Sequence, residues 1–410
     1  MMLDAPASTG AKVEPRTSTA APTCPCCGSR NADVLYRVEQ IPVHSCVLLD
    51  TQQAARAFPR RDLELAFCDD CGFAFNHIFD EAAMRYSTDF EESQHFSDTF
   101  NGFAARLAAE IAARCQTTGK RVLEIGCGKG EFLAELCKVG DARGIGIDPG
   151  YRADVGRANA SERLEFIVDH FGPRYANLDA DVVLCRHTLE HISQVGSFID
   201  DIRRMIGART DTWVMFETPD FKRVLAEAAF WDIYYEHCSY FSPGTHARLF
   251  RDRGFEVTDL ELAYGDQYII QYAQPAPANT RPHLPLEADK NEMRELADAF
   301  VARVRQVKNG WRERLAAARN AGKRVALWGG GSKAVSFLTT LGITDEIQAA
   351  VDINPYKQGK FTPGSGHPVI APQALQELRP DLVIVMNPIY VNEVGKTLSE
   401  LGLEPELTSV

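Results

Sequence analysis

The sequence predicts a three-part α/β protein in which two Rossmann-like domains follow a small cysteine-rich module. From residue 121, and again from residue 323, apolar strands alternate with helices, and this alternation is typical of βαβ units with a parallel sheet. Each stretch begins with a strand, a glycine-rich loop and a helix. Six of the 11 cysteines lie within the first 71 residues, in and between two C-x-x-C-G pairs.

The composition is that of a globular protein with an acidic balance. Hydrophobic residues make up 45% of the 410 residues and charged residues 24%. The net charge of −12 argues against a large nucleic-acid surface, which requires a basic face. No apolar run reaches the roughly 18–20 residues of a membrane span, and the first residues lack the hydrophobic stretch of a secretory signal. We therefore expect a cytoplasmic monomer or homodimer with reduced thiols.

Composition also predicts where the parts begin and end. The proline-rich residues 275–287 form the clearest linker, and a charged amphipathic helix follows them up to Gly322. Before this linker, "RGFEVTDLELAYGDQYIIQYAQ" predicts a closing antiparallel hairpin. The predicted parts are a disordered tail (1–23), a cysteine module (24–78), a core with a lid segment (79–274), a linker with a helix (275–322) and a C-terminal domain (323–410).

The two C-x-x-C-G pairs predict a structural zinc site. Cys24 and Cys27 form the first pair, and Cys68 and Cys71 the second. Each pair presents two thiolates from a tight turn, and four thiolates complete a closed tetrahedral Zn²⁺ site, which leaves no open position for catalysis. A redox C-x-x-C is the alternative, although such pairs stand alone at helix starts. Cys26 lies inside the first pair and makes the register ambiguous.

The first glycine loop, "VLEIGCGKGEFLAEL", indicates a nucleotide-like cofactor. Its glycines let the backbone approach a ligand, and Asp148 ends the next strand about twenty residues later, where an acidic residue accepts hydrogen bonds from ribose hydroxyls. NAD and S-adenosylmethionine both suit this arrangement. The form E-x-G-C-G-x-G resembles class I methyltransferases, which bind S-adenosylmethionine and place a residue such as Asp169 toward the adenine. The expected cofactor-binding residues are Glu124, Gly126, Cys127, Gly128, Asp148 and Asp169.

Four features in this order resemble a more specific family. They are the paired C-x-x-C knuckles, the methyltransferase core, "FWDIYYEHCSYFS" after the fifth core strand, and "VALWGGGSKAVSFL…VDINPYKQGKFTPGSGHPVI" near the end. The combination resembles sugar C-methyltransferases, which methylate nucleotide-linked 4-keto-deoxyhexoses. The resemblance covers nearly all of the chain beyond residue 23, and it implies S-adenosylmethionine and structural zinc as cofactors.

The family places a Tyr-x-Glu-His cluster at the sugar, which corresponds to Tyr234, Glu236 and His237. Methylating carbon requires a carbanion, and a histidine base removes the proton next to a ketone if the developing enolate is stabilised. The resemblance implies His237 as the base, with Glu236 as its orienting partner. Tyr234 and His191 would donate toward the enolate or ketone oxygen. The histidine of an "H-x-x-x-F-[ST]" stretch is also common in methyltransferases without such a role.

Other positions are less specific. Tyr86 and the segment Asp89–Gln94 match a family region that closes over the methyl donor. The family often has Asn-Asp where this chain has Gly128-Lys129, and a His-Gly-Gly-like loop appears as residues 264–267. Arg186, His187 and Glu190 add charge after the fourth core strand, and their roles stay open.

The second glycine loop, Gly329–Lys333, resembles an NAD site when taken alone, because Asp352 ends the next strand. The family resemblance implies instead that this domain holds the nucleotide diphosphate of the substrate. Helix N-terminal amides and a lysine suit a pyrophosphate, and a loop that serves only packing is the remaining alternative. The expected substrate-binding residues are Gly331, Ser332, Lys333, Lys357 and Asn387.

The sequence therefore favours a C-methyltransferase that acts on a nucleotide-linked 4-keto-deoxy sugar, at C3. The nucleotide base is left open among TDP, CDP and GDP. An O- or N-methyltransferase of a sugar or another small metabolite is the nearest alternative. An RNA or protein methyltransferase and a non-catalytic scaffold are more distant ones, and the acidic charge weighs against RNA.

Overall fold

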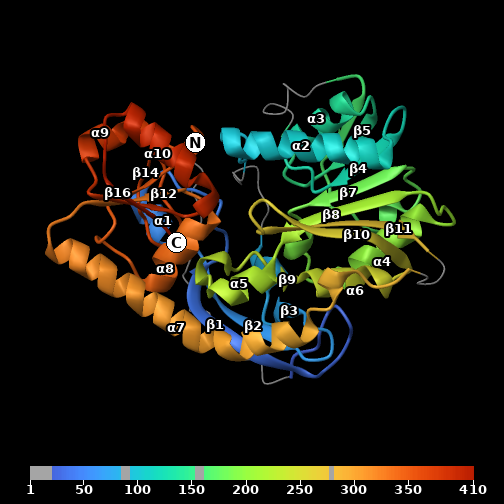
Figure 1. Cartoon of the computed structure of the whole chain (residues 1–410), viewed down its shortest axis with the longest axis horizontal. Coiled ribbons are helices and arrows are strands. Elements are labelled where there is room, and N and C mark those ends of the chain that lie inside the picture. The colour runs from blue at the N-terminus through green and yellow to red at the C-terminus, as the bar shows by residue number, and fades with distance from the viewer. Residues whose placement is uncertain (1–20, 85–92, 153–160, 277–280) are drawn as a thin grey trace, which may run out of the picture.

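The computed structural model describes residues 21–84, 93–152, 161–276 and 281–410. The two α/β units lie side by side, and a smaller antiparallel sheet lies below them (Figure 1). The predicted disordered tail falls almost entirely on residues 1–20, outside the described residues. Among the described residues, no helix has the length and apolar character needed to cross a membrane.

The N-terminal sheet contains a strand from the core. Its four antiparallel strands follow the order β1-β2-β3-β9, and β9 comes from the stretch "FWDIYYEHCSYFS". Ala74 pairs with Tyr240 across the last two strands, so the sheet crosses the predicted boundary at residue 78. The strands are β1 (Ala32–Pro42), β2 (Arg60–Cys68), β3 (Ala74–Asn76) and β9 (Ser239–Tyr240), with the short helices α1 (Gln52–Arg56) and η1 (Glu81–Ala83) on the same part of the chain.

The core sheet has seven strands in the order β10-β11-β8-β7-β4-β5-β6. β11 alone runs opposite to the other six strands, and it forms the predicted closing hairpin with β10. The strand β7 is buried along its whole length, as a central parallel strand covered on both faces requires. The strands are β4 (Arg121–Ile125), β5 (Arg143–Ile147), β6 (Leu164–Ile167), β7 (Val182–Arg186), β8 (Trp213–Pro219), β10 (Phe255–Ala263) and β11 (Tyr268–Pro275).

Helices cover this sheet, and polar caps define where two of them begin. The hydroxyl of Ser97 accepts a hydrogen bond from Phe100 N at the start of α2, and Ser242 and Thr245 form a capping box at the start of α6. The helices are α2 (Asp98–Cys115), α3 (Glu131–Val139), α4 (Val195–Ile206), α5 (Phe221–Glu227) and α6 (Pro243–Arg251), with the short turns η3 (Pro173–Tyr175), η4 (Leu189–His191) and η5 (Phe230–Asp232).

The C-terminal unit is a five-stranded parallel sheet in the order β14-β13-β12-β15-β16. Both α/β units predicted from the sequence are thus present. The elements are β12 (Val325–Trp328), α8 (Ser332–Leu341), β13 (Ala349–Val351), β14 (Val369–Ile370), η7 (Pro372–Ala374), α9 (Leu375–Leu378), β15 (Leu382–Val385), η8 (Pro388–Tyr390), α10 (Val391–Glu400) and β16 (Glu406–Ser409).

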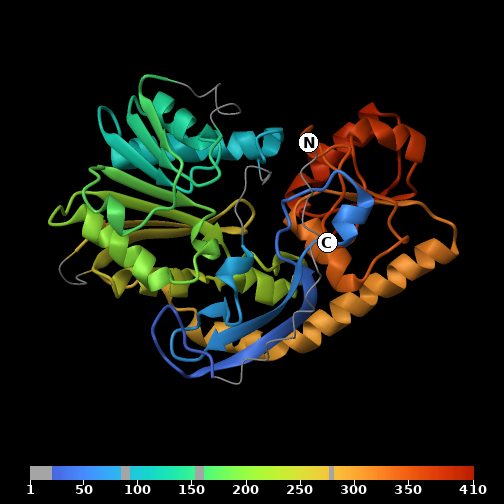
Figure 2. The ribbon, with the colours of Figure 1, turned by 180° about the vertical axis from the view of Figure 1, so that it is seen from behind.

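One long helix connects the parts. After η6 (Pro285–Glu287), α7 (Lys290–Asn320) runs from the N-terminal sheet to the C-terminal unit, as both views show (Figures 1 and 2). The end of the predicted linker is anchored rather than loose, because buried Glu287 accepts two hydrogen bonds from Arg251 on α6.

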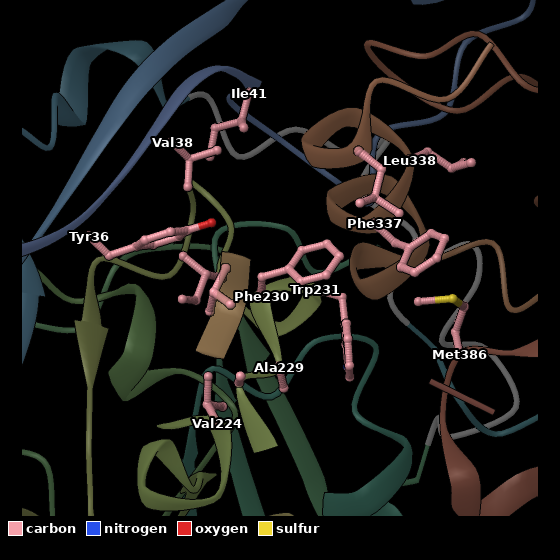
Figure 3. Packing of buried hydrophobic residues seen from close by; sticks show 14 of the residues in the cluster. Tyr36, Val38, Ile41, Val224, Ala229, Phe230, Trp231, Phe337, Leu338 and Met386 are labelled. Atoms are coloured by element: carbon pink, nitrogen blue, oxygen red, sulfur yellow. The ribbon is translucent and has the colours of Figure 1, made fainter. Parts of the chain in front are cut away.

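A hydrophobic cluster joins all three parts. It combines Tyr36 and Val38 of β1, Phe230 of η5 and Phe337 of α8 (Figure 3), together with Phe300 of α7. Burying each large side chain contributes about 1.5–3 kcal/mol. The shared cluster therefore fixes the two α/β units relative to the N-terminal sheet, and with them the loops that face the cavity described next.

Candidate active site

Both glycine loops line a single cavity of about 1250 Å³. The ammonium of Lys129, in the first loop, lies 5.9 Å from the ring centroid of Tyr356, in the loop after β13. The first glycine loop therefore approaches the C-terminal unit at the loop after β13. Parallel sheets bind ligands beyond the carboxyl ends of their strands, and both sheets turn this end toward the same space.

The first loop is built for close approach of a ligand. Gly126, Gly128 and Gly130 have φ of +72°, +53° and +79°, a left-handed conformation that side chains rarely adopt. A Cβ at Gly126 would lie 1.9 Å from Oγ1 of Thr188. Neither the backbone conformation nor the space at this turn therefore admits a side chain.

Acidic residues surround this loop. Asp148 follows β5 and accepts hydrogen bonds from Gly128 N at 2.9 Å and Gly150 N at 2.7 Å. Glu124 is buried in β4, and this burial raises its pKa to about 8 although Arg186 opposes the shift. Asp169 follows β6 and accepts from the Tyr175 hydroxyl at 2.7 Å, which lowers the pKa of its carboxyl. All three acids and Cys127 line the cavity.

The histidines of the candidate site come from two different turns. His191 ends η4 after β7, and His237 lies between η5 and β9. Their rings meet edge to face with centroids 4.7 Å apart, and the Tyr234 ring lies 4.2 Å from that of His237. Burial, with the nearby His191 and His187, lowers the pKa of His237 well below its usual 6.5. Burial raises the pKa of Tyr234, so its phenol keeps its proton.

Glu236 does not orient His237 as the sequence analysis expected. Its buried carboxylate accepts hydrogen bonds from His44 Nδ1 at 3.1 Å and from the hydroxyl and amide of Ser45. Adjacent residues of an irregular segment point in different directions, so sequence adjacency to His237 does not make Glu236 its partner. The carboxylate near His237 belongs to Glu190, because one ligand atom from each of Glu190, His191 and His237 lies within 4.8 Å of the others.

His191 is held through the main chain of Glu236. Its Nδ1 lies 3.0 Å from the Glu236 carbonyl oxygen, and a carbonyl only accepts, so Nδ1 carries the proton in this bond. Nε2 is then the basic nitrogen of the neutral ring. Glu190, His191 and His237 together offer a set of donor atoms that also suits a divalent metal ion.

A charged cluster lies beneath the histidines. His187 Nε2 lies 3.2 Å from one Glu217 oxygen, and Arg186 Nε lies 2.5 Å from the other. Burial alone would lower the pKa of His187, but Glu217 and Glu190 raise it to about 9. His187 also has a left-handed φ of +48°, which is uncommon outside glycine. The cluster therefore places two cations and two carboxylates at the carboxyl ends of β7 and β8.

The second loop contributes a lysine held by an acid. Gly331 caps the N-terminus of α8, and Lys333 in its first turn lies 3.0 Å from Asp232, which also pairs with Arg223 at 2.6 Å. Two cations thus share the Asp232 carboxylate, and Arg223 also pairs with Glu227 at 2.6 Å. Burial raises the pKa of Asp232, but Lys333 and Arg223 outweigh it and lower that pKa overall.

The other predicted substrate-binding residues lie in the same region. Lys357 Nζ is 3.5 Å from Asp352, which accepts from Gly330 N at 2.8 Å. Asn387 accepts a hydrogen bond from the Gln267 side chain at 2.9 Å, and the Gln267 oxygen in turn accepts from Lys333 at 3.2 Å. Gln267 therefore links the core hairpin to the second loop.

The four knuckle cysteines come together at one point. Cys24 Sγ lies 3.6 Å from Cys71 Sγ, and Cys27 Sγ lies 3.7 Å from Cys68 Sγ. Four sulfurs at the ~2.3 Å bond length of tetrahedral zinc lie about 3.8 Å apart, so these separations fit the metal. Cys26 is not part of this group.

The sequence analysis missed some residues of the site, and one residue that it predicted lies outside the described part of the chain. Tyr86 and most of the lid segment lie outside the described residues. Asp232 precedes the Tyr-x-Glu-His cluster by two positions, and that proximity was the available signal. His44 and Ser45 belong to no motif, because their role depends on how the module folds against the core.

Two family models match the chain, one over the core and the other over the long helix and most of the C-terminal unit. Residues 96–260 match the model described as "Methyltransferase domain". Residues 284–403 match the model described as "C-methyltransferase C-terminal domain". The first match, with the observed strand order, confirms the predicted α/β class I methyltransferase fold. It also supports S-adenosylmethionine as the methyl donor.

Two similar proteins cover very different shares of this chain. The C-methyltransferase NovU of Streptomyces niveus is 28% identical over 294 residues, which are 68% of this chain and 69% of NovU. The ubiquinone biosynthesis O-methyltransferase of Nitrobacter winogradskyi is 28% identical over 92 residues, 22% of this chain and 35% of that protein.

Solved structures resemble less than half of the chain. The 1,6-didemethyltoxoflavin-N1-methyltransferase of Burkholderia thailandensis is 19% identical, covers 44% of this chain and 81% of its own, and has a TM-score of 0.33. The magnesium protoporphyrin IX methyltransferase of Synechocystis PCC 6803 is 15% identical, covers 43% and 84%, and has a TM-score of 0.34.

Proposed function

We propose that this chain, an S-adenosylmethionine-dependent methyltransferase, methylates carbon C3 of a nucleotide-linked 4-keto-deoxy sugar. The observation that carries the proposal is the single cavity lined by both glycine loops, with His191 and His237 on its wall. The likeness to the C-methyltransferase NovU and to a C-methyltransferase C-terminal domain supports transfer to carbon. Two loops of this kind suit two nucleotide-bearing ligands in one space.

The first loop would hold the methyl donor. Gly126, Gly128 and Asp148 line the cavity, and Asp148 would accept hydrogen bonds from the ribose hydroxyls. Asp169 would face the adenine. When bound, S-adenosylmethionine supplies an electrophilic methyl group.

His237 would act as the base. Because its pKa lies well below 6.5, the ring is neutral and able to accept the C3 proton. The electron pair of the C–H bond then moves into an enolate. The ring gains a positive charge in this step, and the Glu190 carboxylate within 4.8 Å of the pair of histidines stabilises it.

Two groups would stabilise the enolate oxygen. Tyr234 keeps its phenolic proton and donates it. His191 already donates from Nδ1 to the Glu236 carbonyl, so it donates from Nε2 only when it is an imidazolium. Preorganised donors of this kind contribute most when water is excluded, and the cavity wall around His237 is buried.

The second loop would hold the substrate's diphosphate. The helix N-terminus at Gly331 and Ser332 presents amides, and Lys333, Arg223 and Lys357 add positive charge. Asn387 stands beside them. A diphosphate would compete with Asp232 for Lys333.

Zinc would be structural. Cys24, Cys27, Cys68 and Cys71 would hold it. The carbonyl of Cys71 already accepts a hydrogen bond from Arg248 of α6, and that of Cys26 accepts one from Arg253, just after α6, both at 2.8 Å. The metal would thus hold the module against the core. None of the 11 cysteines, all of which lie in the described residues, forms a disulfide, which suits the reducing cytoplasm.

Mass spectrometry of reactions with TDP-, CDP- and GDP-linked 4-keto-deoxy sugars tests the proposal. We expect a gain of one methyl group with one of them. An O- or N-methyltransferase is the second candidate, because the core match to the ubiquinone O-methyltransferase is compatible with it. Solvent deuterium enters C3 only if carbon is deprotonated, so exchange at C3 separates the two candidates.

A further inference from the structure

The segment His44–Cys46 lies where the three parts of the chain meet. It follows β1 of the N-terminal sheet and is buried, with 4%, 1% and 7% of the three residues exposed. On one side it contacts Glu236 of the core, and on the other Ser332 of the second glycine loop. A segment from the zinc module therefore contacts both a predicted catalytic residue and the predicted substrate loop.

The first set of contacts fixes Glu236. An ionised carboxylate only accepts hydrogen bonds, so His44 donates from Nδ1 at 3.1 Å. Ser45 donates from its amide and its hydroxyl. With three donors in fixed positions, the carboxylate has one preferred orientation, and the backbone of residue 236 is held with it.

The backbone of Glu236 passes this constraint to the histidines. Its carbonyl oxygen accepts the Nδ1 proton of His191 at 3.0 Å, which sets the tautomer and the orientation of the ring. The edge-to-face contact between His191 and His237 depends on that orientation. The pairing of β9 with β3 holds the other end of the same stretch, where Asn76 N donates to Cys238 O at 2.9 Å.

The second contact reaches the substrate loop. Ser45 has one hydroxyl proton and gives it to Glu236, so Ser332 donates its own proton to Ser45 Oγ, at 2.7 Å. Ser332 is the first residue of α8, where amides face the cavity. The hydroxyl chain Ser332–Ser45–Glu236 thus connects the second loop with the residue that orients His191.

We propose that His44 and Ser45 of the zinc module are positioning residues for methyl transfer. They fix Glu236 and through it His191, and Ser45 also contacts Ser332 directly. The inference rests on the proposed function for its effect on catalysis. Its structural part, the tautomer of His191, can be measured without any sugar substrate and does not depend on the proposed function. The zinc module then serves the reaction directly as well as the stability of the fold.

The chain offers a matched control. His77, in the same module, pairs with Glu64 at 2.8 Å, and the two side chains are 7% and 12% exposed. It is not among the residues that line the cavity. His77→Leu therefore removes a buried histidine–glutamate pair of the same kind, without touching Glu236.

The first measurement uses ¹⁵N-histidine NMR of the zinc-loaded enzyme with S-adenosylhomocysteine, with His191 assigned from the spectrum of His191→Gln. We expect the wild type to show His191 protonated at Nδ1, and His44→Leu and Ser45→Ala to lose this single tautomer. His77→Leu should keep it, and His44→Asn should restore it because the amide retains a donor. An unchanged His191 tautomer in both His44→Leu and Ser45→Ala would overturn the proposal.

The second measurement follows methyl transfer and C3 exchange with TDP-4-keto-6-deoxyglucose. Removing a group that orients a functional histidine typically lowers activity by about 10- to 100-fold. We expect a loss of that size in kcat for His44→Leu and Ser45→Ala, with an S-adenosylhomocysteine affinity within about 3-fold of the wild type. An equal loss for His77→Leu would show a merely structural role. If the wild type itself does not turn over, the proposed function fails, and the tautomer measurement still decides the inference.

Discussion

The rings of His191 and His237 meet edge to face, with their centroids 4.7 Å apart. One comes from the turn after β7 and the other from the stretch that joins the N-terminal sheet as β9. Pairing of β9 with β3 therefore ties the stretch that carries His237 to the module. A carboxylate oxygen of Glu190 lies within 4.8 Å of a nitrogen of each ring, which makes it the counter-charge available to either imidazolium.

Replacing His237 should stop carbon deprotonation. His237→Asn removes the base, and general-base catalysis contributes about 10²- to 10⁴-fold, so exchange of deuterium into C3 should fall by that factor. Calorimetry should show S-adenosylmethionine binding within about 3-fold of the wild type, as the control. Because the pKa of His237 lies well below 6.5, the ring is protonated only below pH 6.5. The wild-type kcat/KM should therefore fall only below that pH. Exchange that survives in His237→Asn would assign the base elsewhere.

Gly126 should be required for binding of the methyl donor. Gly126→Ala places a Cβ 1.9 Å from Thr188 Oγ1 at a φ of +72°, so the loop must move. Gly119 is the control, since it has a φ of +73° and nothing within 4 Å. Both variants should lose about 1 kcal/mol of stability from the backbone strain. Only Gly126→Ala should lose S-adenosylmethionine binding in calorimetry, and equal binding by both variants would refute a role for this loop.

Zinc content should depend on Cys27 but not on Cys26. Cys27→Ser removes one of four thiolates, whereas Cys26 lies outside the cluster. Elemental analysis should find one zinc per chain in the wild type and in Cys26→Ser, and much less in Cys27→Ser. Chelation should lower the melting temperature of the wild type and of Cys26→Ser, because the metal holds the module that supports β9. Loss of zinc from Cys26→Ser but not from Cys27→Ser would make Cys26, in place of Cys27, the zinc ligand.

Lys333 should hold the phosphates of the substrate. Lys333→Ala removes a charged hydrogen-bond donor worth about 1.5–3 kcal/mol, so calorimetry should show TDP binding weakened about 10- to 100-fold. Lys360 is the control, because it is 41% exposed and pairs with Asp50 outside the cavity. Equal TDP affinity in both variants would favour a second loop that serves only packing.

The repeating strand–helix pattern made both α/β units predictable from the sequence. Hydrophobic runs such as residues 182–185 are local signals, and the glycine loops follow directly from them. The cysteine pairs were equally clear, because thiols at this spacing suit a tetrahedral metal. Motifs of this kind identify Asp148 or Cys68 without knowledge of what lies across the cavity.

Contacts between distant segments were not predictable. Glu236 was paired with His237 because the two are adjacent in sequence, but its carboxylate contacts Ser45, 191 positions away. Nothing in the residues 44–46 marks them as part of the site. Likewise, β9 lies in the core by sequence but pairs with β3 of the module. This pairing was not predictable, because a strand of two residues is too short to show a periodic pattern.

The most direct test of the account is NMR of the product formed from ¹³C-methyl S-adenosylmethionine and the accepted nucleotide-linked 4-keto-deoxy sugar. The account predicts a methyl group whose ¹³C is bonded to C3 of the sugar, with the C3 proton replaced. A labelled methyl bonded to oxygen or nitrogen, with the C3 proton retained, would contradict it.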